Sequence, residues 1–154
     1  MRIAFAADHA GAALKGELIQ RLGAEPSGHE LVDLGGDGSD PADDYPDFAN
    51  ALGDFVAAGR AERGILICGS GVGAAVAACK IRGIRSSVCH DTYSAHQGVE
   101  HDDMNVLCIG SGVVAADLAG ELIRAFLAAS FDGGERYRRR IEKIEAMERE
   151  ASGV

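Results

Sequence analysis

Short apolar runs alternate with longer helical patterns along almost the whole sequence, and this alternation constrains the fold more than any other feature. Five runs have the length of strands, at residues 2–7, 30–34, 64–68, 85–89 and 105–109. Helical patterns follow them near residues 14–22, 46–58, 74–80, 92–100, 115–128 and 134–150. Each crossover is long enough to hold a helix, so we expect parallel strands covered on both sides. The sequence therefore predicts an α/β fold, a Rossmann-like three-layer sandwich with a five-stranded parallel sheet and a C-terminal helix.

Length and charge limit the class of protein. With 154 residues, of which 47% are hydrophobic, the chain fits a single domain, residues 1–154, with one substantial core. It has neither an apolar run near the roughly 20 residues of a membrane span nor the apolar segment of a signal peptide. A net charge of −9 argues against a nucleic-acid partner, because binding to phosphate backbones needs a positive face. We expect a cytoplasmic protein that binds neither membrane nor nucleic acid.

The cysteines are spaced too unevenly for a metal site or a disulfide framework. Cys68, Cys79, Cys89 and Cys108 form no CxxC pair and share no zinc-ligand spacing with a histidine. In a chain without an export signal such thiols stay reduced. The cysteines therefore give little support to a structural metal site or a redox role.

Side chains that can perform chemistry lie near the ends of the predicted strands. In an open parallel sheet, ligands bind at the carboxyl ends of the strands. The candidates comprise a thiol, imidazoles and carboxylates: Asp8, His9, Cys68, His90, Asp91, His101 and Asp102. We expect these side chains to meet at one edge of the sheet and to form the functional site there.

Cys68 has two possible roles. A free cysteine is often only a small buried apolar side chain, and this is the role that we assign to Cys79, Cys89 and Cys108. Cys68 differs, because it closes a strand and faces the first turn of the next predicted helix. Backbone N–H groups and the helix dipole at such a place lower the pKa of a thiol. This context favours a reactive Cys68.

The turn at residues 69–73, Gly-Ser-Gly-Val-Gly, also allows two interpretations. Its sequence is faintly similar to a dinucleotide-binding loop, and Asp91 lies about where a ribose-binding acid would stand. Its spacing is GxGxG, however, and it follows the third strand instead of the first. A turn of exposed N–H groups can also hold an oxyanion, and this is the interpretation that we favour.

One basic cluster interrupts an otherwise acidic chain, at Arg136, Arg138, Arg139 and Arg140. Arg136 and Arg140 are four residues apart and share one face of the predicted last helix. Because guanidinium groups bind phosphate with two hydrogen bonds, this face is a candidate anion site. The alternative is a solvated helix whose arginines pair with its glutamates. His9 and His101, taken singly, are either functional or structural histidines.

Several segments, in this order, resemble the family of ribose-5-phosphate isomerase type B and galactose-6-phosphate isomerase. They are residues 3–11, 44–46, 64–73, 83–85, 89–95 and 100–107, and they extend over nearly the whole chain. The combination is specific to the family, whereas no single segment is. The resemblance implies an aldose–ketose isomerase of the pentose phosphate pathway that works through an enediolate without metal or cofactor. It also implies a homodimer or tetramer with active sites shared between subunits.

The resemblance further assigns roles to residues of this chain. Cys68 matches the cysteine that moves the proton between C1 and C2, and Ser70 with the N–H groups of Gly71 and Gly73 would stabilise the enediolate oxygen. His101, from the partner subunit, would open the furanose ring as a general acid. Further matched positions would bind the sugar phosphate: Asp8, His9, Tyr45, Gly69, Asp102, Arg136 and Arg140. Of these, His9, Arg136 and Arg140 would hold its phosphate group.

Three positions depart from the family pattern. Some members carry a glutamate where this chain has Ala74, so Cys68 is left as the candidate base. The usual asparagine after the histidine is Asp102, and an arginine common in the family is Gly112. The last two changes make the anion pocket less positive. They leave open a tetrose or hexose phosphate as substrate and, in a different class, a non-catalytic nucleotide- or sugar-binding module.

Overall fold

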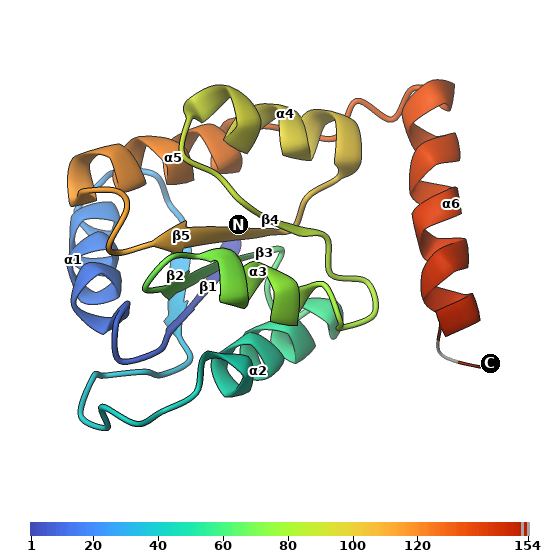
Figure 1. The fold of residues 1–154 in the computed structure, drawn as a ribbon. Coiled ribbons are helices and arrows are strands. Elements are labelled where there is room, and N and C mark those ends of the chain that lie inside the picture. Colours follow the sequence, from blue (N-terminus) through green and yellow to red (C-terminus); the bar gives the residue numbers. More distant parts are fainter. Residues whose placement is uncertain (152, 154) are drawn as a thin grey trace.

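A computed structural model describes residues 1–151 and 153 of the chain. In this part, five strands form one sheet: β1 (Arg2–Ala7), β2 (Glu30–Asp33), β3 (Arg63–Cys68), β4 (Ser86–Val88) and β5 (Val106–Gly110). All strand pairs are parallel, and the order is β2-β1-β3-β5-β4. Helices lie on both sides of the sheet (Figure 1), so the predicted three-layer α/β fold is confirmed.

The helices divide between the two faces of the sheet. They are α1 (Ala12–Gly23), α2 (Tyr45–Ala57), α3 (Val72–Ala78), α4 (Thr92–Asp102), α5 (Ala116–Ala128) and α6 (Glu135–Ala151). α1, α4 and α5 cover one face, where Leu18, Val99 and Phe126 are buried. α2 and α3 cover the other face through residues such as Leu52 and Ala78. The sheet thus separates two apolar cores.

The central strands are buried on both faces. In β3, Ile65 and Ile67 contribute to one core, while Leu66 and Cys68 contribute to the other, as the alternation of side chains along a strand requires. The outer strands β2 and β4 are less buried. This double burial explains the almost uninterrupted apolar run of the third strand. Cys68 is the last residue of β3 and therefore lies at the carboxyl edge of the sheet.

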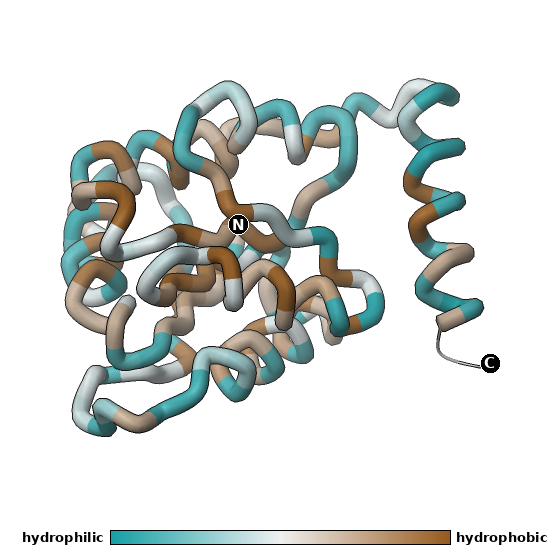
Figure 2. The backbone as a smooth tube through the Cα atoms, viewed as in Figure 1, coloured by the Kyte–Doolittle hydropathy of each residue, from teal (hydrophilic) through white to brown (hydrophobic). Residues whose placement is uncertain are grey.

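The last helix stands beside the sandwich, not on it (Figure 1). Its apolar segments lie on the side toward the rest of the molecule (Figure 2), with Ile141 buried. Ile144 and Met147 nevertheless remain 37% and 67% exposed. α6 therefore presents apolar surface that its own chain leaves uncovered. No helix in the described part of the chain is both long and apolar enough to cross a membrane.

The third helix differs from its predicted position by two residues at each end. It spans Val72–Ala78, and it begins at Val72 because Gly71 adopts a left-handed φ of 78° that turns the chain directly from β3 into the helix. Cys79 becomes the C-terminal cap and is exposed. The prediction that Cys79 is a small buried side chain is therefore wrong, whereas Cys89 and Cys108 are buried as predicted.

Candidate active site

Cys68 ends β3 at the carboxyl edge of the sheet and is buried against the turn that follows. The N–H of Gly71 donates to Sγ of Cys68 over 3.2 Å, and such a donor stabilises negative charge on sulfur. A Cβ atom on Gly71 would lie 2.7 Å from Cγ2 of Val88 and 3.0 Å from the nitrogen of Gly110. Only glycine fits at this position, and its presence brings a backbone N–H to the thiol.

Further polar groups border this turn. The exposed Ser70 hydroxyl accepts the N–H of Val72 over 3.2 Å. The ring of Tyr45 lies against Gly73, since a Cβ atom there would be 2.7 Å from ring carbon Cζ. The N–H of Gly73 belongs to the first turn of α3, where N–H groups have no acceptor within the helix. The turn thus offers a hydroxyl and N–H donors beside a thiol, the set of groups that an enediolate needs.

The loop after β1 is tied to the Cys68 turn. The N–H of Asp8 donates to a β3 carbonyl over 3.3 Å. The Ser111 hydroxyl lies 2.7 Å from the carbonyl oxygen of Ala10 and 3.2 Å from that of Cys68. These contacts hold the buried Asp8 and its neighbour His9 at the same edge of the sheet as Cys68.

His9 has an acidic partner. One oxygen of Asp43 accepts the backbone N–H of His9 over 2.9 Å and lies 2.6 Å from Nδ1 of its ring. The hydrogen bond to Asp43 raises the pKa of His9 above its ordinary 6.5, the charges of Asp43 and Asp8 add to this effect, and desolvation opposes it. The pair therefore favours a charged imidazolium at the Cys68 edge.

His101 lies at the other edge of the sheet. α4 starts beyond β4, where Asp91 caps its first turn by accepting the N–H of Ser94 over 2.7 Å. The helix then runs back for 11 residues, about 16 Å at 1.5 Å per residue, to the edge where β5 begins. The prediction that His101 and Asp102 meet Cys68 at one edge is therefore wrong within a single chain, because α4 carries them away from it.

Both ring nitrogens of His101 have partners. The side-chain amide of Gln97, one helical turn earlier, contacts Nδ1 over 2.7 Å, and the Tyr137 hydroxyl contacts Nε2 over 3.1 Å. The rings of His101 and Tyr137 stack with their centroids 4.4 Å apart. Since Tyr137 lies in the first turn of α6, this stack docks the start of α6 on the end of α4.

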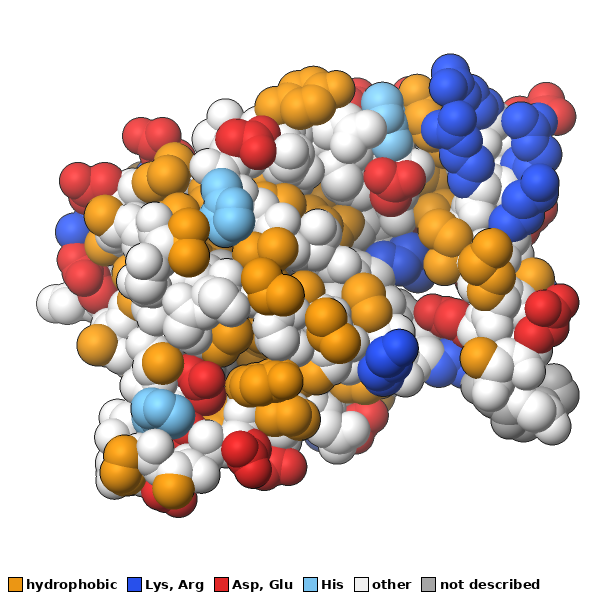
Figure 3. Space-filling model, viewed as in Figure 1, with side chains coloured by type: hydrophobic (Ala, Val, Ile, Leu, Met, Phe, Trp, Pro, Cys, Tyr) orange, Lys and Arg blue, Asp and Glu red, His pale blue; other side chains and the backbone are white. Residues whose placement is uncertain are grey.

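Arg136 and Arg140 lie on either side of Tyr137 in the sequence and are exposed. Figure 3 shows Lys and Arg side chains gathered over the first part of α6. The predicted site residues thus form two groups, one at the carboxyl ends of the strands and one at their amino ends. The Cys68 group consists of Asp8, His9, Tyr45, Cys68, Gly69, Ser70, Gly71 and Gly73, and the His101 group consists of His101, Arg136 and Arg140.

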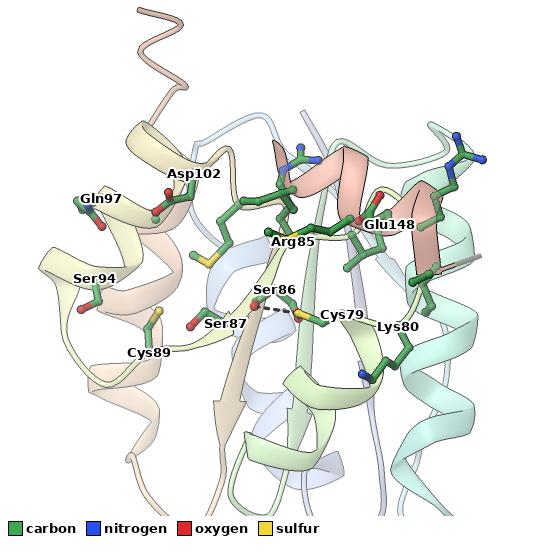
Figure 4. Close-up of a pocket in the computed structure, with 18 residues that line it drawn as sticks. Cys79, Lys80, Arg85, Ser86, Ser87, Cys89, Ser94, Gln97, Asp102 and Glu148 are labelled. Carbon is green, nitrogen blue, oxygen red and sulfur yellow. Dashed lines mark hydrogen bonds between the residues drawn. The ribbon is translucent and has the colours of Figure 1, made fainter. Parts of the chain in front are cut away.

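A cavity of about 690 Å³ separates α6 from the sandwich. Figure 4 shows the side chains that line it, among them Cys79, Ser86, Asp102 and Glu148. The Cys79 thiol lies 3.0 Å from the Ser86 hydroxyl. Asp102 thus faces this cavity and not the Cys68 turn, whose cysteine is not among the lining residues.

Sequence reasoning missed several residues that organise the two groups, namely Lys15, Asp43, Gln97 and Tyr137. Lys15 is buried, and its ammonium group contacts the Asp33 carboxylate and a backbone carbonyl. The four-residue spacing of Gln97 from His101 could have identified that pair. Lys15 and Asp43, by contrast, meet partners 18 and 34 residues away across loops, where no periodicity applies.

Potential metal ligands are dispersed over the molecule. Within residues 1–151 and 153, no three His, Cys, Asp or Glu side chains come together as a metal-binding group. The thiol, the imidazoles, the arginines and the N–H donors named above are groups that can exchange protons or bind an anion.

Curated proteins resemble this chain over almost its full length. Ribose-5-phosphate isomerase B of Escherichia coli (strain K12) is 44% identical over 147 residues, which are 96% of each chain. D-erythrulose-4-phosphate isomerase 2 of Mycolicibacterium smegmatis is 39% identical over 132 residues, covering 86% of this chain and 87% of that protein.

Solved structures and a family model agree with this likeness. Type B ribose 5-phosphate isomerase from Trypanosoma cruzi has a TM-score of 0.92 at 37% identity, covering 97% of this chain and 99% of that one. Ribose-5-phosphate isomerase B from Mycoplasma genitalium, with bound ribulose-5-phosphate, has a TM-score of 0.89 at 39% identity and 97% coverage of both chains. A family model described as Ribose/Galactose Isomerase matches residues 3–144. The chain therefore belongs to the ribose/galactose isomerase family.

Proposed function

We propose that this chain interconverts ribose 5-phosphate and ribulose 5-phosphate, with Cys68 as the base that transfers a proton between C1 and C2. The names of the Escherichia coli relative and of the ribulose-5-phosphate complex support this choice of reaction. The observation in this chain that carries the proposal is the N–H of Gly71 at the Cys68 sulfur, beside further donors of the same turn. Cytoplasmic pentose phosphate metabolism is the proposed setting.

In the proposed mechanism, the Cys68 thiolate removes the proton from C2 of the open-chain aldose. The electron pair moves to the C1 carbonyl oxygen and forms an enediolate, which the Ser70 hydroxyl and the N–H of Gly73 stabilise, while the N–H of Gly71 donates to the Cys68 sulfur. The thiol then returns its proton to C1, and the hydroxyl proton passes from O2 to O1 to give the ketose. Because a proton next to a carbonyl is only weakly acidic, base and oxyanion donors must act together. The reaction needs no redox cofactor, since the proton is returned to a neighbouring carbon.

The proposed reaction requires a second copy of the chain. The Cys68 group holds the base, whereas the ring-opening acid His101 and the phosphate ligands Arg136 and Arg140 lie at the opposite edge of the same chain. Gly112, where many family members carry an arginine, adjoins the Cys68 turn and adds no positive charge to it. We therefore propose a homodimer, or a tetramer of such dimers, in which the His101 group of one copy meets the Cys68 group of the other.

Exposed apolar side chains support such an interface. Val76 on α3 is 58% exposed, Tyr93 on α4 is 75% exposed and Met147 on α6 is 67% exposed. Large apolar side chains in water are expected where another surface covers them. The apolar surface of α6 that its own chain leaves uncovered is part of this proposed interface.

A tetrose or hexose phosphate is the second candidate for the substrate. Two relatives at 39% and 37% identity are named D-erythrulose-4-phosphate isomerases. Asp102 and Gly112 remove a hydrogen-bond donor and a positive charge that many family members have, which changes what the pocket accepts. A non-catalytic sugar- or nucleotide-binding module is the alternative from a different class, and it would bind its ligand without turnover.

The test is isomerisation of four-, five- and six-carbon aldose phosphates by the wild type and two cysteine variants. Cys68→Ala should lower kcat/KM for ribose 5-phosphate by roughly 10²- to 10⁴-fold, the usual contribution of an acid–base group. Cys79→Ala, which changes an exposed thiol away from the turn, should keep the activity. Equal loss in both variants would refute Cys68 as the base. Preference for another sugar would replace ribose 5-phosphate as substrate, and no turnover across the panel would favour the binding module.

A further inference from the structure

The carboxylate of Asp43 contacts two atoms of His9. Oδ1 of Asp43 lies 2.9 Å from the backbone nitrogen of His9 and 2.6 Å from Nδ1 of its ring. The Asp43 side chain is only 14% exposed, whereas that of His9 is 40% exposed. The carboxylate is therefore fixed, and because Nδ1 is occupied, Nε2 is the ring atom left to bind a ligand.

These contacts connect the loops that build the Cys68 group. Asp43 lies in the connection between β2 and α2, two residues before Tyr45. His9 lies in the loop after β1, which shares the Ser111 hydroxyl with the carbonyl oxygen of Cys68. The Asp43–His9 pair is thus positioned beside the base and beside the ring that borders the turn.

We propose that Asp43 is a positioning residue that holds His9 as an imidazolium with Nε2 directed at the substrate phosphate. This rests on the proposed function, since the ligand is taken to be a sugar phosphate. A carboxylate that accepts from Nδ1 leaves the Nε2 proton for a phosphate oxygen, and such charge-assisted hydrogen bonds are about twice as strong as neutral ones. At the Cys68 edge of a chain with a net charge of −9, the imidazolium of the pair offers a positive charge and the Nε2 proton to the phosphate.

Some of the charged groups around the pair favour protonated His9, and others favour the neutral ring. The hydrogen bond to Asp43 raises the pKa of His9 above 6.5 against the effect of desolvation, and the charges of Asp43 and Asp8 add to the rise. Desolvation and the charge of Asp37 act against ionisation of Asp43, but the contacts with His9 outweigh them and lower the pKa of Asp43. The hydrogen bond with Ser39 lowers the pKa of Asp37, and the charge of Lys15 adds to this effect. In the proposed dimer, Arg136 and Arg140 of the second copy approach the same phosphate and favour the neutral ring. Asp43 is therefore the group whose removal changes the charge of His9 most directly.

Asp43→Asn separates the charge of the carboxylate from its role in anchoring the loop, because the amide oxygen can still accept both N–H groups. Near neutral pH, we expect KM for ribose 5-phosphate to rise about tenfold and kcat to change by less than about twofold. Competitive inhibition by inorganic phosphate should weaken as pH rises through the pKa of His9. In the variant this weakening should begin at lower pH. NMR titration of the His9 ring measures the same downward shift without reference to activity.

Two further variants make the result decisive. Asp40→Asn removes the same charge from the same loop, and its oxygen likewise accepts a backbone N–H, that of Ala42 at 2.9 Å; it should leave KM unchanged. His9→Gln defines the loss of affinity expected without the imidazolium. If phosphate affinity and the His9 titration are unchanged in Asp43→Asn while His9→Gln binds weakly, the proposal is wrong but the proposed function stands. An equal rise of KM in Asp40→Asn also refutes it. If the wild type has no isomerase activity, the proposed function fails, and the NMR titration still decides the Asp43–His9 pair.

Discussion

Gly71 sets the geometry of the Cys68 turn through its backbone alone. It combines a φ of 78° with a position where a Cβ atom would approach Val88 to 2.7 Å and the backbone of β5 to 3.0 Å. An L-residue there would be strained in its backbone and would push the β5 side of the turn away. The N–H that meets the sulfur of Cys68 would move with it.

Gly71→Ala is therefore expected to lower the free energy of unfolding by roughly 2 kcal/mol and to reduce kcat. Gly16→Ala is the matched control, because Gly16 lies within α1, where an added Cβ atom would have no neighbour within 4 Å. Since glycine weakens a helix, this control should raise the free energy of unfolding by about 0.5–1 kcal/mol and keep the activity. Urea unfolding and steady-state kinetics measure both effects. Full activity and stability in Gly71→Ala would contradict the tight-turn argument.

The other thiols differ from one another in their surroundings. Burial raises the pKa of Cys89 to about 11 and that of Cys108 well above its ordinary value, whereas Cys79 is exposed. Only the thiolate is alkylated, so a raised pKa lowers reactivity below that pH. Iodoacetamide at pH ~8 should label Cys79 of the folded protein and spare Cys89 and Cys108, as peptide mapping by mass spectrometry would detect. Labelling of Cys108 before Cys79 would contradict the burial described here.

At the scale of helices and strands, the stack of His101 on Tyr137 joins two elements. It connects the last turn of α4 to the first turn of α6, which carries Arg136, and Arg140 follows in the next turn. A second connection, from the N–H of Gly83 to the Glu148 carboxylate over 3.2 Å, lies near the other end of α6. The start of α6 is therefore held on α4 by this aromatic contact, together with the N–H of Asp132, which donates to the Glu100 carbonyl over 2.9 Å.

Tyr137→Ala should release this end of α6. An aromatic pair contributes about 0.5–1.5 kcal/mol beyond its burial, so KM for ribose 5-phosphate should rise by roughly three- to tenfold as the arginines lose their fixed position. Trypsin should also cut faster within residues 136–140. Tyr137→Phe keeps the stacked ring and should resemble the wild type in both measurements. The same loss of affinity in Tyr137→Phe would show that the hydroxyl, and not the stack, is required.

The order of strands and helices followed from the sequence, and most contacts between loops did not. The apolar run that became β3 predicted its strand to within one residue, because burial on both faces leaves a continuous pattern. The position of His101 at the opposite edge was also accessible, since a helix of 11 residues after a strand must carry its last turn back across the sheet. The Asp43–His9 contact was not, because it joins residues 34 positions apart through irregular loops. The exposure of Cys79 depended on where α3 ends, and a sequence pattern does not fix the end of a helix to the residue.

For the whole molecule, the central feature is the separation of one proposed site into two halves. A thiol with its N–H donors and the Asp43–His9 pair lie at the carboxyl edge of the sheet. The His101–Tyr137 stack and the arginines of α6 lie at the amino edge. A helix of about 16 Å separates the two edges of one chain, and this separation is why we propose that two copies meet to complete the site.

Complementation between two inactive variants tests this account most directly. Cys68→Ala and His101→Asn should each have little activity with ribose 5-phosphate when expressed alone. When they are co-expressed, random pairing makes about half of the dimers mixed, and each mixed dimer holds one site with both residues intact, so activity should return to about a quarter of the wild-type value. If each site were formed within one chain, the mixed preparation would stay as inactive as the separate variants, and that result would contradict the account.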